Sequence, residues 1–187
     1  MTRLKLGIVV QLLLLTACAT TELTDRFPIE KMLPLSELRQ WSFEGRLSVV
    51  GQPVIFVSWH HDVDHERLKL SGPLGQGATT IDLTPNKIMI DKGAGEVLIS
   101  DQVEAFLFEK TGVPIPVQSL RYWVMGLPLP SQAYQMTDNG FVQTGWLVEY
   151  KQLQIVGAAY RPAKIFASNT QNKIKLIIDQ WDVGNAK

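Results

Sequence analysis

Apolar and polar residues alternate with a period of two from Ser42 onward, a pattern typical of half-buried β-strands. In the first stretch, residues 43–49, the side chains of Phe43, Leu47 and Val49 share one face. Comparable stretches separated by Gly, Pro, Asn and Asp predict further strands at 54–60, around 68–70, and at 79–83, 87–91, 96–100, 134–136, 141–144, 146–150, 154–159, 164–167 and 174–181. We expect these stretches to form about ten to eleven short strands, joined by hairpins into an antiparallel sheet.

Helical spacing replaces this alternation in three places. Residues 34–41 carry proline at a first helical turn and predict a short helix. Residues 101–112 begin with a capping box completed by Glu104 and end at Gly112. Residues 118–126 place apolar side chains on one helical face. A sheet this large should curl toward a barrel, and the last two helices should bury their apolar faces on its concave side.

The apolar positions of the strands predict the residues of that concave face. A sheet curled around helices encloses an apolar cavity if it stays unclosed, although most such side chains in most proteins form only core. The candidates on the first strands are Ile55, Val57, Trp59, Leu68, Leu70, Ile81, Leu83, Ile88 and Ile90, and their counterparts are Trp123, Leu127, Trp146, Val148, Ile174, Leu176 and Ile178.

The N-terminus has the pattern of a bacterial lipoprotein signal peptide. Two basic residues precede an apolar run from Leu6 to Leu15, which is too short to span a bilayer comfortably. Small residues then lead to Cys18, the only cysteine of the chain, which excludes an internal disulfide. We expect cleavage after residue 17 and acylation of Cys18. The alternative is an ordinary signal peptide followed by a chance cysteine.

Composition constrains the mature part of the chain. The region 18–33 is predicted to be the acylated cysteine and a linker, and 34–187 a single domain. The whole chain has 18 basic and 18 acidic residues, and removal of 1–17 leaves 16 and 18, a formal charge of −2. No basic run suggests binding of nucleic acid or anionic lipid. No later stretch has the length of a transmembrane span.

The segment 110–128 carries two short motifs, TG-x-P-I-P and SLR-x-W-x-x-GLP. Together they resemble the central signature of the LolB family of outer-membrane lipoprotein receptors. Pro73-Leu74-Gly75 and Ile174-Lys175-Leu176 match the same family, and the resemblance runs from about Trp41 to Val183.

The resemblance implies an incomplete antiparallel β-barrel, mainly β in class, with helices as a lid over an apolar cavity that receives acyl chains. Such a protein takes lipoproteins from the periplasmic carrier LolA and places them in the outer membrane, facing the periplasm. It performs no covalent chemistry and needs no cofactor beyond the acyl group on Cys18. Ala19 after that cysteine, where retained lipoproteins of enteric bacteria carry Asp, also favours the outer membrane. We expect a monomer.

Leu74 is the sharpest candidate for a functional side chain. It lies between Pro73 and Gly75 in a loop with no other large apolar residue, so it should point into solvent. A turn residue folded back on the core is the alternative. The resemblance favours a protruding loop, and we expect Leu74 to enter the bilayer surface and help to release the cargo's acyl chains.

Other chemistry finds little support in the sequence. His60, His61 and His65, with Asp62 and Asp64, resemble a zinc site, but strand alternation sends the first two to opposite faces of an expected exposed turn. There is no G-x-S-x-G motif and no placed nucleophile, so we expect no enzyme. Arg121, on the second of the central helices, has no visible acidic partner.

Two other functions are compatible with the same fold. One is a structural lipoprotein that scaffolds an envelope complex, which the Leu74 loop and the apolar concave face oppose. The other is a soluble carrier like LolA, which Cys18 opposes.

Overall fold

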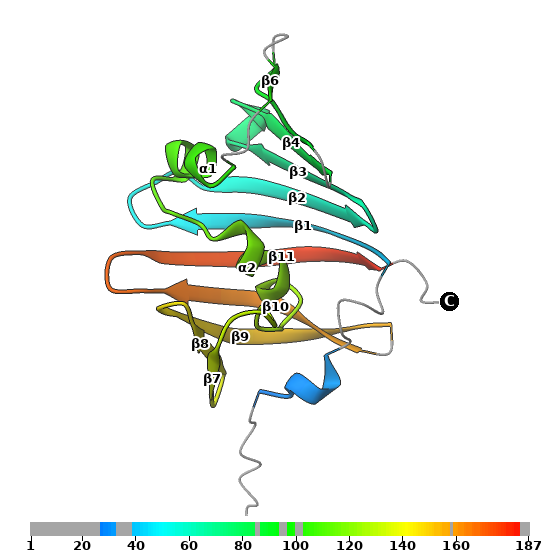
Figure 1. Ribbon diagram of the computed structural model, residues 1–187, viewed down its shortest axis with the longest axis vertical. Helices are drawn as coiled ribbons and strands as arrows, with labels where there is room; N and C mark the ends of the chain where they lie inside the picture. Colours follow the sequence, from blue (N-terminus) through cyan, green and yellow to red (C-terminus); the bar gives the residue numbers. More distant parts are fainter. Residues whose placement is uncertain are drawn as a thin grey trace, which may run out of the picture.

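The computed structural model describes residues 27–32, 39–84, 87–93, 97–99, 103–157 and 159–183, which form one antiparallel sheet with two helices (Figure 1). The sheet has eleven strands in the order β6-β5-β4-β3-β2-β1-β11-β10-β9-β8-β7. The two ends of that order, β6 and β7, are not paired with each other, so the sheet is open. The predicted class, a mainly β fold with an incomplete antiparallel barrel, is confirmed.

The elements follow the chain in two blocks of strands with the helices between them. The first block contains β1 (Gln40–Val49), β2 (Ile55–Asp62), β3 (His65–Ser71), β4 (Thr79–Thr84), β5 (Lys87–Asp91) and β6 (Val97–Ile99). The helices are α1 (Val103–Thr111) and α2 (Val117–Trp123). The second block contains β7 (Tyr134–Thr137), β8 (Gly140–Gln143), β9 (Trp146–Val156), β10 (Ala159–Ser168) and β11 (Lys173–Val183). Short 3-10 helices occupy Ile29–Lys31 and Pro73–Gly75.

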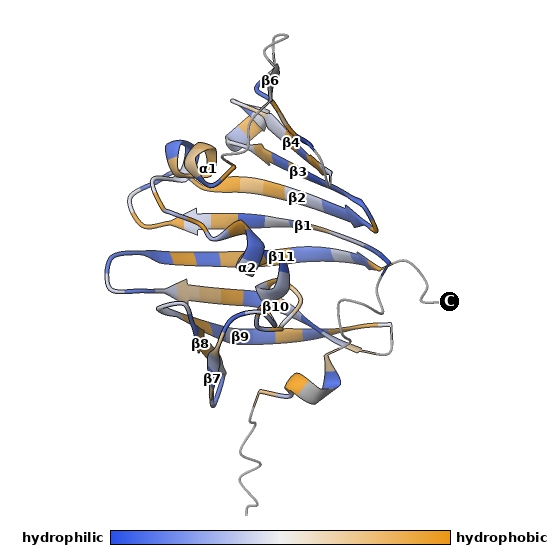
Figure 2. Cartoon of the chain, in the orientation of Figure 1, coloured by the Kyte–Doolittle hydropathy of each residue, from blue (hydrophilic) through white to orange (hydrophobic). Residues whose placement is uncertain are grey.

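The pairing of β1 with β11 joins the two blocks into one sheet. Phe43 pairs with Trp181 and Leu47 with Leu176, and all four side chains are buried. Along both strands, buried and more exposed residues alternate, and Figure 2 shows the same alternation as orange and blue bands. One apolar face therefore continues across the junction.

The predicted helix at 34–41 is wrong at its end, because Gln40 and Trp41 belong to β1. Trp41 is fully buried and continues the inward row that Phe43 begins, with its ring 5.7 Å from that of Trp59. Packing in this aromatic cluster outweighs the weak helical signal of a short segment. Residues 34–38 of the predicted helix lie outside the described residues.

The strands predicted at 146–150, 154–159 and 164–167 are in fact two long strands, β9 and β10, joined by a turn at Gly157. The pairing shifts register near Pro162 and again near Lys164. Each shift displaces the alternation by one residue, so the sequence pattern breaks where the strand continues.

Residues 27–32 belong to the folded unit, although the predicted domain begins only at residue 34. The ring of Phe27 stacks on that of Tyr150 at 4.3 Å, and the Phe27 N–H donates to the carbonyl oxygen of Asp138 over 2.8 Å. Met32 is buried as well. This part of the predicted linker therefore packs against the domain.

Both predicted central helices are confirmed and cross the concave face of the sheet (Figure 1). Val103, Phe106 and Leu107 of α1 are buried, and the helix ends before Gly112, whose φ of +69° suits a helix C-terminus. The predicted N-cap, Asp101, lies outside the described residues. Neither helix is long and apolar enough to cross a membrane.

Gly45→Ala should destabilise the fold because a Cβ at this position would lie 2.3 Å from the backbone oxygen of Ile177. Gly45 sits where β1 shifts register against β11, so relief would require moving a backbone. We expect a loss of about 1–3 kcal/mol in the free energy of unfolding, measured by urea denaturation. Ser48→Ala on the same strand is the control, and equal stability of the two variants would contradict this account.

Candidate functional site

An apolar cavity lies between the central strands and the two helices. The space between them, which includes its opening to solvent, is about 400 Å³. Strand residues form the floor and residues of α1, α2 and their connection form the roof. The lining consists of Phe43, Leu47, Val57, Trp59, Leu68, Leu70, Leu107, Thr111, Ile115, Leu120, Val124 and Leu176.

The chemistry of this lining is almost purely apolar. The one aliphatic hydroxyl, that of Thr111, lies 2.8 Å from the carbonyl oxygen of Leu107 and 3.0 Å from that of Val113. The indole N–H of Trp59 donates to a carboxylate outside the lining, Glu66, over 3.1 Å. The lining residues that the structure describes therefore supply no titratable group, and the cavity suits a ligand that brings hydrocarbon.

The predicted concave-face residues divide into three groups. Val57, Trp59, Leu68, Leu70 and Leu176 lie on the cavity wall. Others are buried in the core away from the cavity, namely Ile81, Ile90, Trp123, Trp146, Val148, Ile174 and Ile178. The remaining four are only partly buried, namely Ile55, Leu83, Ile88 and Leu127. Their contact with acyl chains stays a prediction for all of them.

The cavity is confined to one part of the concave face because α2 and its C-terminal turn fill another. The indole N–H of Trp123 donates to Oε1 of Gln143 over 3.0 Å, and the hydroxyl of Tyr150 donates to the carbonyl oxygen of Trp123 over 2.8 Å. Burial raises the pKa of Tyr150 well above its ordinary value, so this hydroxyl remains a donor. Trp146 and Val148 therefore pack against protein and not against a void.

Sequence reasoning misses seven lining residues. Phe43 and Leu47 belong to the inward row of β1, whose alternation is visible in the sequence but does not by itself assign them to the wall. The other five come from the helices and their connection, namely Leu107, Thr111, Ile115, Leu120 and Val124. Helical spacing identifies their apolar faces but does not say which residues face a void.

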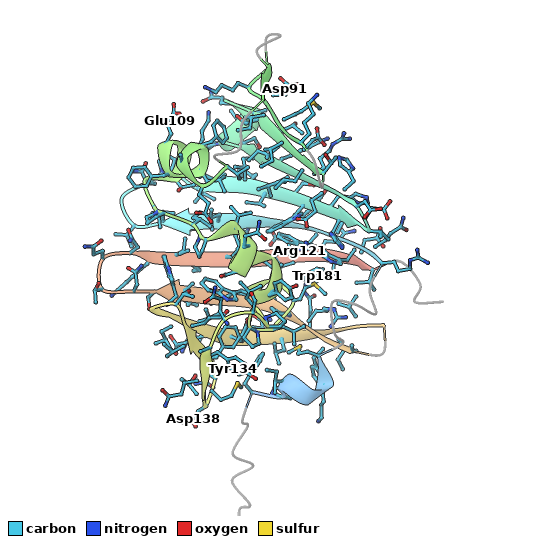
Figure 3. The ribbon with its side chains drawn as sticks, in the orientation of Figure 1. Asp91, Glu109, Arg121, Tyr134, Asp138 and Trp181 are labelled. Carbon is cyan, nitrogen blue, oxygen red and sulfur yellow. The ribbon has the colours of Figure 1, made fainter. Side chains whose placement is uncertain are left out.

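A charged cluster ties α2 to the sheet beside the cavity. Nε of Arg121 lies 2.9 Å from Oε1 of Glu66 on β3, as a charge pair without in-line hydrogen-bond geometry. Oε2 of Glu66 accepts the hydrogen bond from Trp59 on the cavity floor. Nη2 of Arg121 lies 3.4 Å from both ring nitrogens of His61. Arg121, which Figure 3 labels beside α2, therefore contacts two strands of the floor.

The expectation that Arg121 has no acidic partner is thus wrong. Glu66 lies 55 residues earlier in the chain and faces inward on β3 between the buried Leu68 and the turn at 63–64. Only the curling of the sheet under α2 brings the two charges together. Their separation from bulk water strengthens the attraction and makes the loss of either partner costly.

The strand pleat sends His60 and His61 to opposite faces, as predicted, but the expectation of an exposed turn is wrong for both, because they belong to β2 and the turn comprises only residues 63–64. His60 is exposed, whereas His61 is buried and stacks on Trp41 at 5.1 Å. Nε2 of His65 lies 2.9 Å from Oδ1 of Asp82 on the neighbouring strand. Within the described part of the chain, no three His, Cys, Asp or Glu side chains are grouped to hold a metal ion.

Asp82 also accepts a hydrogen bond from Arg67 over 2.7 Å. Burial alone would raise the pKa of Asp82, but the hydrogen bonds from Arg67 and His65 outweigh it and lower the pKa. Asp82 on β4 thus forms an ion pair with Arg67 and a hydrogen bond with His65, both on β3.

Leu74 projects from the β3–β4 loop, with 97% of its surface exposed. The alternative of a side chain folded back on the core is excluded. Its backbone has φ 58° and ψ 23°, a left-handed conformation that leucine rarely adopts. The loop is held by its own hydrogen bonds, including Gly72 N–H to the oxygen of Gln76 at 2.7 Å. The fold therefore fixes an apolar side chain in water.

The cavity lies toward the same end of the sheet as this loop, which we call the Leu74 end. There β1 ends, β2 begins, β3 ends and β11 begins, since Phe56 pairs with Ser71 and Val49 with Ile174. The lining residues Leu47, Leu70 and Leu176 lie within three residues of these strand ends. Contents of the cavity would thus have a short path to the exposed leucine.

The fold and the cavity define an open half-barrel protein with an apolar cavity under a helical cover. The profile of the family described as outer membrane lipoprotein LolB matches residues 39–181, and the chain belongs to that family. The predicted family resemblance is thereby confirmed. The matched region contains every lining residue of the cavity and Leu74.

Individual relatives agree with this assignment. The chain is 27% identical over 165 residues to the outer-membrane lipoprotein LolB of Nitrosococcus oceani, covering 83% of this chain and 82% of the relative. It is 26% identical over 184 residues to that of Francisella tularensis, covering 90% and 89%. A crystal structure of a LolA superfamily protein from Nitrosomonas europaea superposes with a TM-score of 0.46 and 6% identity, covering 85% of this chain and 91% of that one.

Glu66→Ala should weaken the attachment of α2 to the sheet. The change leaves the guanidinium of Arg121 and the indole N–H of Trp59 without their carboxylate. We expect the free energy of unfolding to fall by roughly 2–3 kcal/mol, below the range for fully buried pairs because Arg121 is partly exposed. Urea denaturation measures this, and hydrogen exchange should show faster opening of α2.

Asp179→Ala is the matched control, since it removes an exposed pair in which Arg46 and Asp179 lie 2.6 Å apart. It should change stability little because solvent screens such a pair. Equal losses in Glu66→Ala and Asp179→Ala would show that the buried cluster has no special role.

Proposed function

We propose that this protein is the receptor of lipoprotein transport at the outer membrane. It accepts lipoproteins from a LolA-like periplasmic carrier, holds their acyl chains in the apolar cavity, and inserts them into the membrane. The observation that carries the proposal is an almost purely apolar cavity that lies toward the same end of the sheet as a fully exposed leucine, in a chain of the LolB family.

The energetics suit transfer between proteins. Moving an acyl chain from water into the cavity would be favourable by about 0.8 kcal/mol per methylene. Moving it from one apolar cavity to another changes little, so direction has to come from small differences in fit and in the cost of displacing the helices. The cavity is small for several chains, so acceptance requires α1 and α2 to shift away from the floor.

Leu74 is the proposed membrane-insertion residue. Leu74 gains no stabilisation from burial within the protein, because 97% of its surface is exposed and its loop is closed by local hydrogen bonds. A left-handed leucine carries a conformational cost of about 1–2 kcal/mol. A bilayer would recover the apolar surface that the fold leaves in water, and the adjacent cavity would empty into the same region.

The membrane anchor completes the proposal. Cys18 and the predicted signal peptide lie outside the described residues, and their role rests on the sequence pattern. An acyl group on Cys18 would hold the domain at the periplasmic face of the outer membrane and raise the local concentration of the cavity there. No cofactor and no covalent chemistry enter, and a monomer suffices.

The scaffold alternative is less well supported. A scaffold needs a partner surface but no cavity, and it gains nothing from an exposed leucine held by a strained backbone beside that cavity. A soluble carrier would share the cavity, but it would have no use for the anchor predicted at Cys18.

A transfer assay tests the proposal and the role of Leu74 together. The full-length protein is reconstituted in liposomes and supplied with purified carrier loaded with a lipoprotein. Leu74→Glu should accept cargo normally but deliver it to the bilayer at least tenfold more slowly, because a carboxylate resists entry into lipid. Leu74→Met, which keeps an apolar side chain, is the control and should deliver normally. Unchanged delivery by Leu74→Glu would refute the insertion role.

Leu120→Trp tests the cavity itself. Leu120 is a partly buried lining residue on α2, and a larger side chain should occupy the empty volume. We expect a several-fold loss of affinity for a fluorescent fatty acid, which a lipoprotein should displace from the unaltered protein. Leu120→Met conserves volume and should bind as before. Equal binding by the Trp variant, with its fold verified by circular dichroism, would place the acyl site elsewhere.

A further inference from the structure

The exposed apolar side chains are unevenly distributed over the surface. Nine large hydrophobic residues are exposed among those that the structure describes. Four of them lie in two neighbouring connections, the β1–β2 turn with the start of β2 and the β3–β4 loop, namely Val50, Val54, Phe56 and Leu74. Monomers rarely group exposed apolar residues without a partner for them.

The register of the strands brings these two connections together. β2 is hydrogen-bonded to both β1 and β3, and Phe56 pairs with Ser71, the last residue of β3. The β1–β2 turn and the Leu74 loop therefore project from the same end of adjacent strands. In Figure 1 this end is at the left, where β1 turns into β2.

The backbone of the β1–β2 turn directs the side chain of Val50 into solvent, as the β3–β4 loop does for Leu74. It is 79% exposed and occupies a tight turn in which the N–H of Gln52 donates to the carbonyl oxygen of Val49 over 3.1 Å. Gly51 provides the positive φ, +80°, that such a turn requires at its third position. The turn thus presents a β-branched apolar side chain at its tip, where a polar residue would be equally compatible with the fold.

We propose that the β1–β2 turn is a second membrane contact, so that the protein docks on the bilayer through two adjacent loops with Val50 and Leu74 at their tips. This inference rests on the proposed function and extends it from one inserting residue to an apolar rim. The rim is defined by Val50, Val54, Phe56 and Leu74. Its occupant is the lipid surface.

Two exposed ammonium groups near the rim favour lipid, with the exposed carboxylate of Glu109 adjoining one of them. Lys110 in the last turn of α1 and Lys173 at the start of β11 are exposed at the same end, and neither forms an ion pair within the described part of the chain. Ammonium groups beside apolar tips match a bilayer, whose phosphates lie just above its hydrocarbon. The apolar side chains are also raised on turns, a shape that suits insertion better than a flat protein interface.

The rim also borders the cover of the cavity. A Cβ on Gly112, at the end of α1, would lie 3.4 Å from Nε2 of Gln52, which is part of the β1–β2 turn. Contact of this turn with lipid therefore occurs next to the helix that roofs the cavity. Acyl chains leaving from under α1 would emerge at the membrane and not into water.

Single-cysteine variants of the full-length protein test the proposal. Because Cys18 is the only native cysteine, and is acylated under the proposed function, Val50→Cys, Leu74→Cys and Ile155→Cys would each supply one free thiol for a polarity-sensitive fluorophore. Ile155 is the matched control, since it is 71% exposed but lies next to the turn at Gly157, at the opposite end of the sheet. The proteins are reconstituted in liposomes of phosphatidylethanolamine and phosphatidylglycerol.

We expect the emission of the labels at 50 and 74 to shift to the blue and to be quenched by nitroxide-bearing lipids, while the label at 155 stays unchanged. A shift at 74 without one at 50 would overturn the two-loop rim and leave the proposed function intact. No shift at either position would refute the insertion of Leu74 as well.

Transfer kinetics give an independent reading. Val50→Glu should slow delivery about tenfold, the effect expected for losing burial of one aliphatic side chain, and should leave acceptance from the carrier unchanged. Ile155→Glu should alter neither step. If Val50→Glu instead impaired acceptance, the turn would be a contact for the carrier protein, and the proposal would be wrong.

Discussion

The concave face of the open sheet is apolar and has to be shielded from water. The rest of this structure depends on the fact that the helices cover this face only in part. In the sheet order, the antiparallel strands from β5 to β8 place one row of inward side chains after another on the same face. Only two short helices and their connections are available to cover it within the described residues. Over β8 and β9 they pack closely, whereas over β1, β2, β3 and β11 they leave an apolar void. The apolar cavity results from this difference between the extent of the floor and that of its cover.

The helices need an attachment that holds without filling the void. The Glu66 cluster provides it at the edge of the cavity, where one carboxylate contacts Arg121 of α2 and Trp59 of the floor. A charge pair of this kind keeps its position through electrostatics and hydrogen bonds, and it leaves the apolar lining free for a ligand. It also links movement of α2 to the floor, since shifting the helix separates Arg121 from Glu66.

The direction of the strands places three connections at the same end of the sheet. Hairpins alternate between the two ends of an antiparallel sheet, so the β1–β2 turn, the β3–β4 loop and the β10–β11 turn all project from the Leu74 end. The cavity lies toward this end too. Cavity, exposed apolar side chains and the end of α1 thus meet in one region, which suits a protein that passes acyl chains from itself to a membrane.

The sequence by itself predicted most of the strands, the central helices and the family, whereas for Leu74 it left exposure and burial open and only the family resemblance favoured exposure. These depend on local features: a period of two, capping residues, the motifs of 110–128, and a loop rich in glycine and proline. Tertiary structure alone decided which inward residues line the cavity, that Arg121 meets Glu66 and that Trp41 belongs to a strand. It also decided that the turn with Val50 and the loop with Leu74 project from the same end of the sheet. The periodicity of a strand gives the side of each residue but not what lies opposite, because that depends on segments far away in the chain.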